Sequence, residues 1–317
     1  MEKIGVAVIG AGFWGKNHIR VLSELPNVNL KAICDVDQER AAKLGVAYRI
    51  PYYTRLDMLL DRRDVEAVTI CTPTVTHYSI ALRALKAGKH ILVEKPMTST
   101  LEEAETLIRE AESRKLTLAV GFIERFNPAV QYLKRLVDGK QLGRVLLIMA
   151  RRVSRWPERI GDVGVTKDSA IHDVDVMRYI LQDEVDTVYA KTGSYQHRFE
   201  DWSEIMLQFK GGEVGFIDAN WLTPRKIRTL IVTGSEATAT LDYLTQEISI
   251  EDSEKTVKPK MRWIEPLKLE LESFTDAILE GRDSDIPTGA AGLEALKVCE
   301  AVLKSSVEGK PIKIRHG

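Results

Sequence analysis

The chain has 317 residues, a formal net charge of -1 and three cysteines. This length is enough for two domains, and the near-neutral charge argues against a nucleic-acid partner and against a general affinity for membranes. The cysteines lie far apart, and no CxxC pair indicates a metal or redox site. The first apolar run begins near residue 1, and no apolar run approaches about 18 residues. We therefore expect no signal peptide, no membrane span and a cytoplasmic protein.

A strand, a glycine turn, a helix and a second strand follow one another at the start of the chain. An apolar run from Ile4 predicts the first strand, and the turn at residues 10–15 reads GAGFWG. A helical segment follows, and a second apolar run then ends at Asp35. This order is the context that the dinucleotide-binding fingerprint requires.

Each glycine of the turn has an expected role. Gly10 permits the tight turn, Gly12 lets the backbone approach a pyrophosphate, and Gly15 lets the helix pack on the strand. The helix N-terminus suits phosphate. Asp35, about twenty residues after Gly15, is placed to bind a ribose diol and would repel a 2′-phosphate. NAD is therefore favoured over NADP, although a nearby arginine, Arg40, can accommodate the extra phosphate.

Alternating strands and helices continue as far as residue 122. The expected strands are 67–71, 90–93 and 117–120, and the expected helices are 38–44, 54–60, 76–87 and 100–113. This pattern predicts a parallel, doubly wound sheet of the α/β class. Ligands of such sheets bind beyond the carboxyl ends of the strands. That rule selects two more segments, residues 72–74 (TPT) and 94–96 (EKP).

Both segments have two interpretations. Residues 72–74 are either a strand-ending turn or a cofactor contact, and His77 either caps locally or faces the cofactor. Lys95 is either a surface lysine paired with Glu94 or a ligand-facing group held by the following proline. The residues expected to contact the cofactor are Gly10, Ala11, Gly12, Phe13, Trp14, Gly15, Asp35, Thr72, Pro73, Thr74, His77, Glu94 and Lys95.

These motifs together resemble a known family. The TP at 72–73, His77, the ALKAGKH at 84–90 and the EKPM at 94–97 are similar to the Gfo/Idh/MocA oxidoreductases, the family of glucose–fructose oxidoreductase and inositol dehydrogenase. The resemblance implies a Rossmann domain that binds a nicotinamide cofactor. It also implies hydride transfer between that cofactor and a hydroxyl carbon of a sugar or cyclitol.

The chain changes character after the GFIERFN at residues 121–127. Strand-like runs with glycine turns fill most of residues 145–250, which predicts an α+β domain with an open, mostly antiparallel sheet. We expect domains at 1–122 and 123–317, with the C-terminal segment able to pack back on the first. A sheet with an exposed face usually needs a partner, so we expect a homodimer or homotetramer.

A helix expected at residues 168–181 carries a polar stripe. Asp168, His172, Asp175 and Tyr179 share one face, opposite an apolar stripe. The stripe is either a solvated surface or an acid–base group, in which a carboxylate one turn away orients the imidazole. A metal pair ranks lower, because no third ligand is evident.

The segment KDSAIHDVDVMRYIL is similar to the family's second-domain motif, whose Asp and His line the substrate site. The resemblance places Asp168 and His172 at those positions and Lys95 at that of the EKP lysine. His172 would then be the general base, and Lys95 would stabilise charge on the same oxygen. Asp168 would orient His172, and Asp175 would bind a neighbouring hydroxyl.

The substrate is indicated by the segments around this helix. GFIERFNPAV and RRVSRWPERIGDVGVTKDSAIHDVD resemble a branch that includes UDP-N-acetylglucosamine 3-dehydrogenases. A basic cluster that suits phosphate precedes the helix and consists of Arg151, Arg152, Arg155, Arg159 and Lys167. Strand alternation turns Arg151 and Arg152 to opposite faces, so the alternatives are pairing with Glu158 and Asp162 or a subunit contact. Trp156 is either a wall for sugar or uracil stacking or a core or interface residue.

The sequence thus favours an NAD-dependent dehydrogenase of a UDP-N-acetylhexosamine, acting at C3. The alternatives are an inositol 2-dehydrogenase, a free-sugar dehydrogenase, an enzyme that never releases its cofactor, and a non-catalytic NAD(H)-binding sensor. The expected catalytic residues are Lys95, Asp168 and His172, and no metal is expected. The expected substrate contacts are Lys95, Arg152, Trp156, Asp168, His172 and Asp175.

Overall fold

The structure, a computed structural model, describes residues 3–156, 162–281 and 286–316. The chain forms two compact units. The first comprises Met1–Phe122 and Glu265–Leu293, and the second comprises Ile123–Ile264 and Glu294–Gly317. The predicted domain limits, 1–122 and 123–317, stay a prediction.

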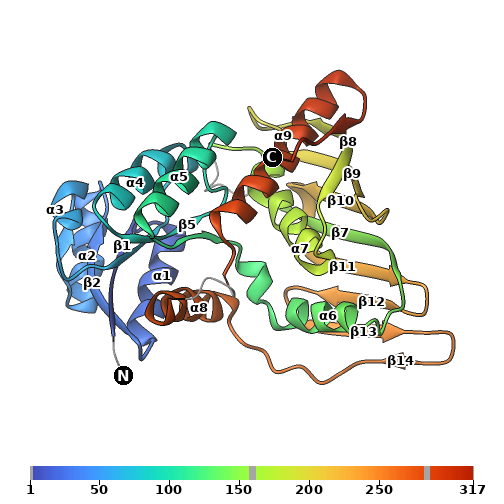
Figure 1. Cartoon of the computed structure of the whole chain (residues 1–317), viewed down its shortest axis with the longest axis horizontal. Coiled ribbons are helices and arrows are strands. Elements are labelled where there is room, and N and C mark those ends of the chain that lie inside the picture. The colour runs from blue at the N-terminus through green and yellow to red at the C-terminus, as the bar shows by residue number, and fades with distance from the viewer. Residues whose placement is uncertain (1–2, 157–161, 282–285, 317) are drawn as a thin grey trace. The chain divides into compact units, whose positions relative to one another are not determined.

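The first unit is built on a six-stranded parallel sheet in the order β3-β2-β1-β4-β5-β6 (Figure 1). Its strands are β1 (Ile4–Ile9), β2 (Val28–Cys34), β3 (Tyr52–Tyr53), β4 (Ala67–Ile70), β5 (His90–Glu94) and β6 (Leu118–Gly121). Its helices are α1 (Phe13–Glu24), α2 (Gln38–Tyr48), α3 (Leu56–Leu60), α4 (Thr74–Lys86), α5 (Leu101–Arg114) and α8 (Pro266–Glu280). This order is that of the dinucleotide-binding sheet, so the predicted parallel α/β fold is confirmed.

Helices cover both faces of this sheet, with α1 and α8 on one side and α4 and α5 on the other (Figure 1). Every residue of β1 and β4 is buried, as expected for central strands of a parallel sheet. Asn27 ties α8 to the segment after α1, because its amide donates to Thr275 at 3.0 Å and to Asp276 at 2.7 Å. Helices thus cover both faces, and ligands of such sheets bind beyond the carboxyl ends of the strands.

Local sequence signals account for the start of α5 but not for the end of α2. The helix predicted at residues 100–113 is present as α5, and a capping box of Thr100 and Glu103 starts it. The predicted end of α2 at Gly45 is wrong, because the helix continues to Tyr48 and ends with Arg49 at φ 56°. Gly45 is instead needed for packing, since a Cβ there would lie 2.8 Å from the ring of Tyr52.

The second unit holds a nine-stranded sheet in the order β14-β13-β12-β11-β7-β10-β9-β8-β15 (Figure 1). Its strands are β7 (Val145–Arg155), β8 (Val185–Gly193), β9 (Trp202–Phe209), β10 (Val214–Asn220), β11 (Leu222–Gly234), β12 (Thr238–Asp242), β13 (Glu247–Glu251), β14 (Thr256–Val257) and β15 (Ile312–Lys313). Its helices are α6 (Pro128–Asp138), α7 (Ile171–Leu181) and most of α9 (Gly289–Glu308). The mostly antiparallel sheet is confirmed, but β7 and β10 pair in parallel.

Helices cover one face of the second sheet. Met177 of α7 packs on β10, since its sulfur lies 3.1 Å from where a Cβ on Gly215 would be. Ser305 of α9 accepts a hydrogen bond of 3.0 Å from the backbone of Ala190 in β8. Burial alternates along β9, whose residues from Ser203 to Phe209 are in turn buried and exposed. The opposite face is therefore left open. Among the described residues, no helix combines the length and apolar character that crossing a membrane requires.

Candidate active site

The glycine turn after β1 leaves no room for a side chain at two of its three motif positions. Gly10 has φ of +89°, and a Cβ there would lie 2.8 Å from the carbonyl of Cys71. A Cβ on Gly15 would lie 1.8 Å from the carbonyl oxygen of Gly10. A Cβ on Gly12, in contrast, would meet nothing within 4 Å. The space beside Gly12 fits the close approach of a cofactor phosphate to the backbone.

Helix α1 starts directly at this turn. No side chain caps it at Gly12, and the first N–H groups of a helix, together with its dipole, attract a phosphate. Phe13 is 65% exposed, and its ring meets that of Trp14 edge-on with centroids 5.9 Å apart. The predicted cofactor contacts of the turn thus lie together beyond β1, and their contact with NAD stays a prediction.

Asp35 follows β2 and lies against the glycine turn. Its buried carboxylate accepts hydrogen bonds from the backbone N–H groups of Ala11 at 2.6 Å and of Asp37 at 2.9 Å. Arg40 donates to the same carboxylate at 3.3 and 3.4 Å and pairs with Asp37 at 3.0 Å. Arg40, which the sequence left open as a phosphate contact, is therefore engaged by two carboxylates.

The segment after β4 is tied together by a histidine. Thr76 donates to the hydroxyl of Thr72 at 2.8 Å or to the carbonyl of Pro73 at 2.7 Å. His77 is 1% exposed, and its ring nitrogens lie 2.8 Å from the carbonyl oxygen of Thr72 and 2.9 Å from that of Pro96. His77 thus contacts the backbone of Thr72 and of Pro96, and its predicted contact with the cofactor stays a prediction.

The EKP segment follows β5, and its three side chains differ in exposure. Glu94 is buried, and its carboxylate lies 3.1 Å from Nε2 of His18 in α1. Lys95 is half-buried, and the Lys95–Pro96 peptide bond is cis. Glu94 thus pairs with His18, a histidine that the sequence did not single out because it lies in an ordinary helix-forming stretch.

The second candidate centre, at Asp168 and His172, lies where a π-helical turn (Thr166–Ala170) passes into α7. The helix predicted at residues 168–181 is therefore present, but its first turn is π-helical, and such turns are frequent at functional sites. Asp168 is 9% exposed and accepts a hydrogen bond of 3.1 Å from Ser169, whose oxygen accepts one of 3.2 Å from the indole of Trp221. His172 is half-buried.

The polar stripe of α7 is not a solvated surface. Asp175 is fully buried, and both of its oxygens accept hydrogen bonds from Arg125, at 2.5 and 2.7 Å. The guanidinium of Arg125 also lies 5.0 Å from the ring centre of Tyr179. Burial acts to lower the pKa of Arg125, but the charge of Asp175 raises it overall. This gives Asp175 a structural role, and its contact with a substrate hydroxyl stays a prediction.

Arg152 is likewise held by carboxylates inside the unit. It is 4% exposed, and it donates to Asp173 at 2.7 and 3.0 Å and to Glu124 at 2.9 Å. Arg228 lies 3.4 Å from the same carboxylate of Glu124. Arg152 is therefore committed to a buried ion-pair network, and its predicted contact with substrate stays a prediction. The sequence missed both acids, since nothing in a local pattern pairs residues this far apart.

The rest of the basic cluster divides between the faces of the sheet. Arg151 and Arg155 are exposed, and Arg151 pairs with Asp218 at 2.9 Å. The predicted separation of Arg151 from Arg152 is therefore confirmed. Lys167 pairs with Glu300 at 2.6 Å. Arg159 and its suggested partner Glu158 lie outside the described residues.

Trp156 belongs to an aromatic cluster. Its ring centre lies 4.4 Å from that of His197 and 5.1 Å from that of Trp221, and Phe199 stacks on His197 at 5.6 Å. Trp156 and His197 are half-buried, and Trp221 is 3% exposed. Trp156 is thus partly a packing residue, and stacking against a sugar or uracil stays a prediction.

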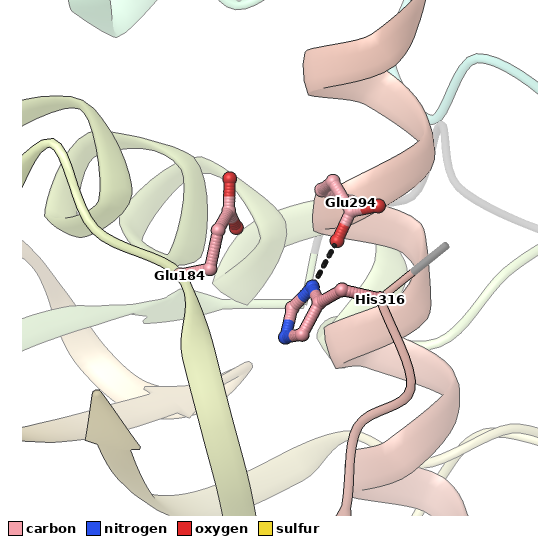
Figure 2. A group of neighbouring side chains, drawn as sticks. All are labelled: Glu184, Glu294 and His316. Atoms are coloured by element: carbon pink, nitrogen blue, oxygen red, sulfur yellow. Dashed lines mark hydrogen bonds and ion pairs between the residues drawn. The ribbon is translucent and has the colours of Figure 1, made fainter. Parts of the chain in front are cut away.

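One group of side chains has the composition of a metal site. Glu184, Glu294 and His316 offer ligand atoms that all lie within 4.8 Å of one another (Figure 2). Arg178 donates twice to Glu184 at 2.7 Å, and Lys297 donates to Glu294 at 2.6 Å. Because these cations already neutralise the carboxylates, the group is better described as an ion-pair network than as a metal centre.

The three cysteines are disfavoured as nucleophiles. Burial raises the pKa of the Cys34 thiol to about 11, and it also raises the pKa values of Cys71 and Cys299. A thiol of raised pKa is neutral at pH 7 and unreactive. The three cysteines are therefore better described as packing residues than as nucleophiles.

Comparison with known proteins decides the family. Residues 4–122 match the family described as "Oxidoreductase family, NAD-binding Rossmann fold", and residues 130–240 match the "GFO/IDH/MocA C-terminal domain". An uncharacterized oxidoreductase of Bacillus subtilis is 31% identical, over 99% of this chain and 98% of the relative. The chain belongs to the Gfo/Idh/MocA oxidoreductase family. The predicted family, oxidoreductase class and NAD cofactor are thereby confirmed.

Two other Gfo/Idh/MocA relatives carry different names. A UDP-N-acetylglucosamine 3-dehydrogenase of Acidithiobacillus ferrooxidans is 29% identical, over 97% of each chain, and its solved structure superimposes with a TM-score of 0.89 over 96% of this chain and 98% of that one. An inositol 2-dehydrogenase of Rhizobium meliloti is also 29% identical, over 97% of this chain and 98% of the relative.

Proposed function

We propose that the chain is an NAD-dependent dehydrogenase that oxidises a secondary hydroxyl carbon of a sugar derivative, with UDP-N-acetylglucosamine, at C3, as the first candidate substrate. The similarity to the Acidithiobacillus ferrooxidans enzyme extends over both units of the chain. NAD is favoured over NADP because Asp35 lies at the glycine turn and Arg40 is engaged by two carboxylates.

The observation that carries this proposal is the position of Lys95. It lies at the carboxyl end of β5, in the sheet edge that also holds the glycine turn and Asp35. Ligands of doubly wound sheets bind at this edge. A half-buried lysine there, directly after a buried carboxylate, is suited to contact a reacting group rather than to solubilise the surface.

The proposed chemistry divides between named side chains. When bound, the nicotinamide supplies the hydride acceptor. His172 accepts the hydroxyl proton of the substrate. General-base catalysis of this kind raises the rate of reaction about 10²- to 10⁴-fold. The ammonium of Lys95 hydrogen-bonds the alcohol oxygen and stabilises its developing negative charge. Asp168, itself held by Ser169, orients the imidazole of His172.

A second candidate is oxidation of inositol or of a free sugar. The Rhizobium meliloti relative, named as an inositol 2-dehydrogenase, has the same 29% identity over similar coverage. A non-catalytic NAD(H) sensor is opposed by the presence of Lys95, Asp168 and His172 together. An enzyme that retains its cofactor would show the absorbance of bound nicotinamide after purification.

The test is an NADH absorbance assay with a panel of UDP-N-acetylglucosamine, UDP-glucose, myo-inositol and free glucose, each with NAD and with NADP. We expect turnover of a UDP-sugar with NAD, and loss of at least about a hundredfold in Lys95→Ala and His172→Asn. Lys86→Ala, an exposed lysine of α4, is the control. No turnover of any UDP-sugar would reject the first substrate, and a fully active Lys95→Ala enzyme would reject the catalytic assignment.

We also propose that the open face of the second sheet binds a second copy of the chain. Apolar residues from five adjacent strands form one cross-strand row: the half-buried Ile231 and the exposed Met149, Phe216, Met206 and Tyr189. The next row holds two cations and two anions, which are Arg151, Asp218, Glu204 and Lys191. A patch with an apolar row and balanced charges is complementary to itself, as a two-fold interface requires.

Phe216→Glu places a charge in the middle of the apolar row and is expected to convert the oligomer to a monomer in light scattering coupled to gel filtration. Leu244→Glu, a similarly exposed leucine in the turn between β12 and β13, is the control and should leave the mass unchanged. A monomeric parent protein, or an unchanged mass in Phe216→Glu, would reject this interface.

A further inference from the structure

Lys95 stands out in an otherwise buried stretch. Residues 91–98 are all buried except Lys95, which is half-buried. The ammonium ends a chain of four methylene groups that is flexible by itself. Its position therefore depends on how firmly the neighbouring residues, Glu94 and Pro96, are held.

Glu94 is held by a buried histidine of α1. The carboxylate of Glu94 lies 3.1 Å from Nε2 of His18, which is 0% exposed. A carboxylate only accepts, so Nε2 carries the hydrogen. Nδ1 of His18 is buried without a hydrogen-bond partner among the described residues. A residue needed only for packing would be apolar at this position, and the lack of a side chain at Gly121 leaves the room that the Glu94 carboxylate occupies.

Pro96 is held by a second buried histidine, from α4. The ring nitrogens of His77 lie 2.9 Å from the carbonyl oxygen of Pro96 and 2.8 Å from that of Thr72. Both carbonyls are acceptors, so each ring nitrogen that carries a hydrogen can donate to the carbonyl it faces. His77 thus links the segments that follow β4 and β5.

We propose that His18 and His77 are positioning residues for Lys95: one fixes the residue before it and the other fixes the residue after it. The inference rests on the proposed function, because it takes Lys95 as a catalytic residue. A displacement of about 1 Å at a reacting group can cost about a hundredfold in rate. Loosening either anchor should therefore lower kcat more than it weakens cofactor binding.

Replacing each histidine by Asn or by Gln distinguishes a positioning role from a packing role. Gln places its nitrogen near the position of Nε2, and Asn places it near that of Nδ1. At residue 18, where Nε2 makes the contact, His18→Gln should retain kcat and His18→Asn should lose it. At residue 77, where Nδ1 faces Pro96, the order reverses: His77→Asn should retain kcat and His77→Gln should lose it.

The kinetic readout is the separation of kcat from KM, measured on whichever panel substrate is turned over. We expect the disfavoured variants to lose at least about tenfold in kcat, with KM for NAD within about threefold of the parent. In a Lys95→Ala background the four variants should lower the residual rate no further. Equal losses for Asn and Gln at each position, or a parallel rise in KM, would assign both histidines to packing alone and overturn the proposal.

A spectroscopic readout needs no substrate. Reductive methylation with ¹³C labels the lysines, and Lys95→Arg identifies the resonance of Lys95. His18→Gln and His77→Asn should keep that resonance at its parent position, and the other two variants should shift it. If Lys95→Ala is fully active, the proposed function fails. If Lys95→Ala is inactive but the resonance is the same in all four variants, only the positioning proposal fails. If a variant at one histidine does not fold, the Asn and Gln variants at the other histidine decide the proposal, because the expected order of their kcat values is reversed there.

Discussion

The carboxylate of Asp35 accepts a hydrogen bond of 2.6 Å from the backbone N–H of Ala11, which joins the end of β2 to the glycine turn after β1. The same carboxylate holds Arg40 at 3.3 Å. A carboxylate has about four acceptor positions, and the contacts from Ala11, Asp37 and Arg40 occupy all four. A ribose diol would therefore have to replace the long contacts from Arg40. One side chain thereby shapes the turn and restrains the nearby arginine, and its contact with an adenosine ribose stays a prediction.

Asp35→Ser should shift cofactor preference from NAD toward NADP. Loss of a charge-assisted hydrogen bond costs about 1.5–3 kcal/mol, or about ten- to a hundredfold in KM for NAD. KM for NADP should fall, because the repulsion disappears and Arg40 is released toward a 2′-phosphate. Steady-state kinetics with both cofactors measure the change. Arg40→Leu added to Asp35→Ser should remove the NADP gain, and a gain that survives this second substitution would contradict the argument.

The glycine turn provides two substitutions of identical chemistry with opposite expected effects. Gly12→Ala should fold normally and bind NAD at least about tenfold more weakly, because the new methyl group enters the open space beside the backbone. Gly15→Ala should lower the melting temperature, because its Cβ would lie 1.8 Å from the carbonyl oxygen of Gly10. Calorimetry measures the NAD affinity of Gly12→Ala, and thermal unfolding measures the melting temperature of Gly15→Ala. Normal NAD affinity in Gly12→Ala would contradict a phosphate site there.

The ion pair of Arg125 with Asp175 should be needed for folding. Arg125→Met leaves a fully buried carboxylate without its partner, and breaking such a pair costs about 3–5 kcal/mol. Asp175→Leu added to Arg125→Met should recover most of the loss. Arg151→Met, which breaks an exposed pair with Asp218, should cost no more than about 1 kcal/mol. Urea unfolding measures all three, and equal losses at Arg125 and Arg151 would contradict the assignment.

The features that the sequence predicted correctly are those set by short-range physics. The glycine turn and the start of α5 at Thr100 depend on residues within a few positions of one another. The exposure of Lys95 between buried neighbours also follows from its place directly after a strand. For these features, local patterns and the direction of a parallel sheet suffice.

The sequence could not predict ion pairs and hydrogen bonds between residues that lie far apart in the chain. Periodicity placed Asp175 on a polar face, but it could not show that Arg125, fifty positions away, binds both of its oxygens. Arg152 was grouped with its basic neighbours, although two distant acids hold it. His18 carried no signal at all, since a histidine in a helix is ordinary until its neighbour is known. The sequence predicted that the helix at residues 38–44 ends before Gly45, because helix propensity does not include the contact of Gly45 with the Tyr52 ring.

The carboxylate of Glu294 should make stability depend on pH. Burial acts to raise the pKa of Glu294, but hydrogen bonds from Lys297 and His316 lower it overall. Figure 2 shows the contact with His316. A carboxyl group whose pKa is lower in the folded state stabilises the fold above its unfolded pKa, and this contribution disappears as the pH falls through the folded pKa. Glu294→Gln should therefore lower the free energy of unfolding at pH 7 by about 1–2 kcal/mol.

The difference between Glu294→Gln and the parent should shrink once the pH falls below the ordinary glutamate pKa of about 4.3. Urea unfolding at pH 7, 5 and 3.5 measures this difference in the free energy of unfolding. The matched control is Glu247→Gln, at an exposed glutamate at the start of β13, and its difference from the parent should not depend on pH. A loss in Glu294→Gln that stays constant from pH 7 to 3.5 would mean that the side chain acts through packing and not through its charge.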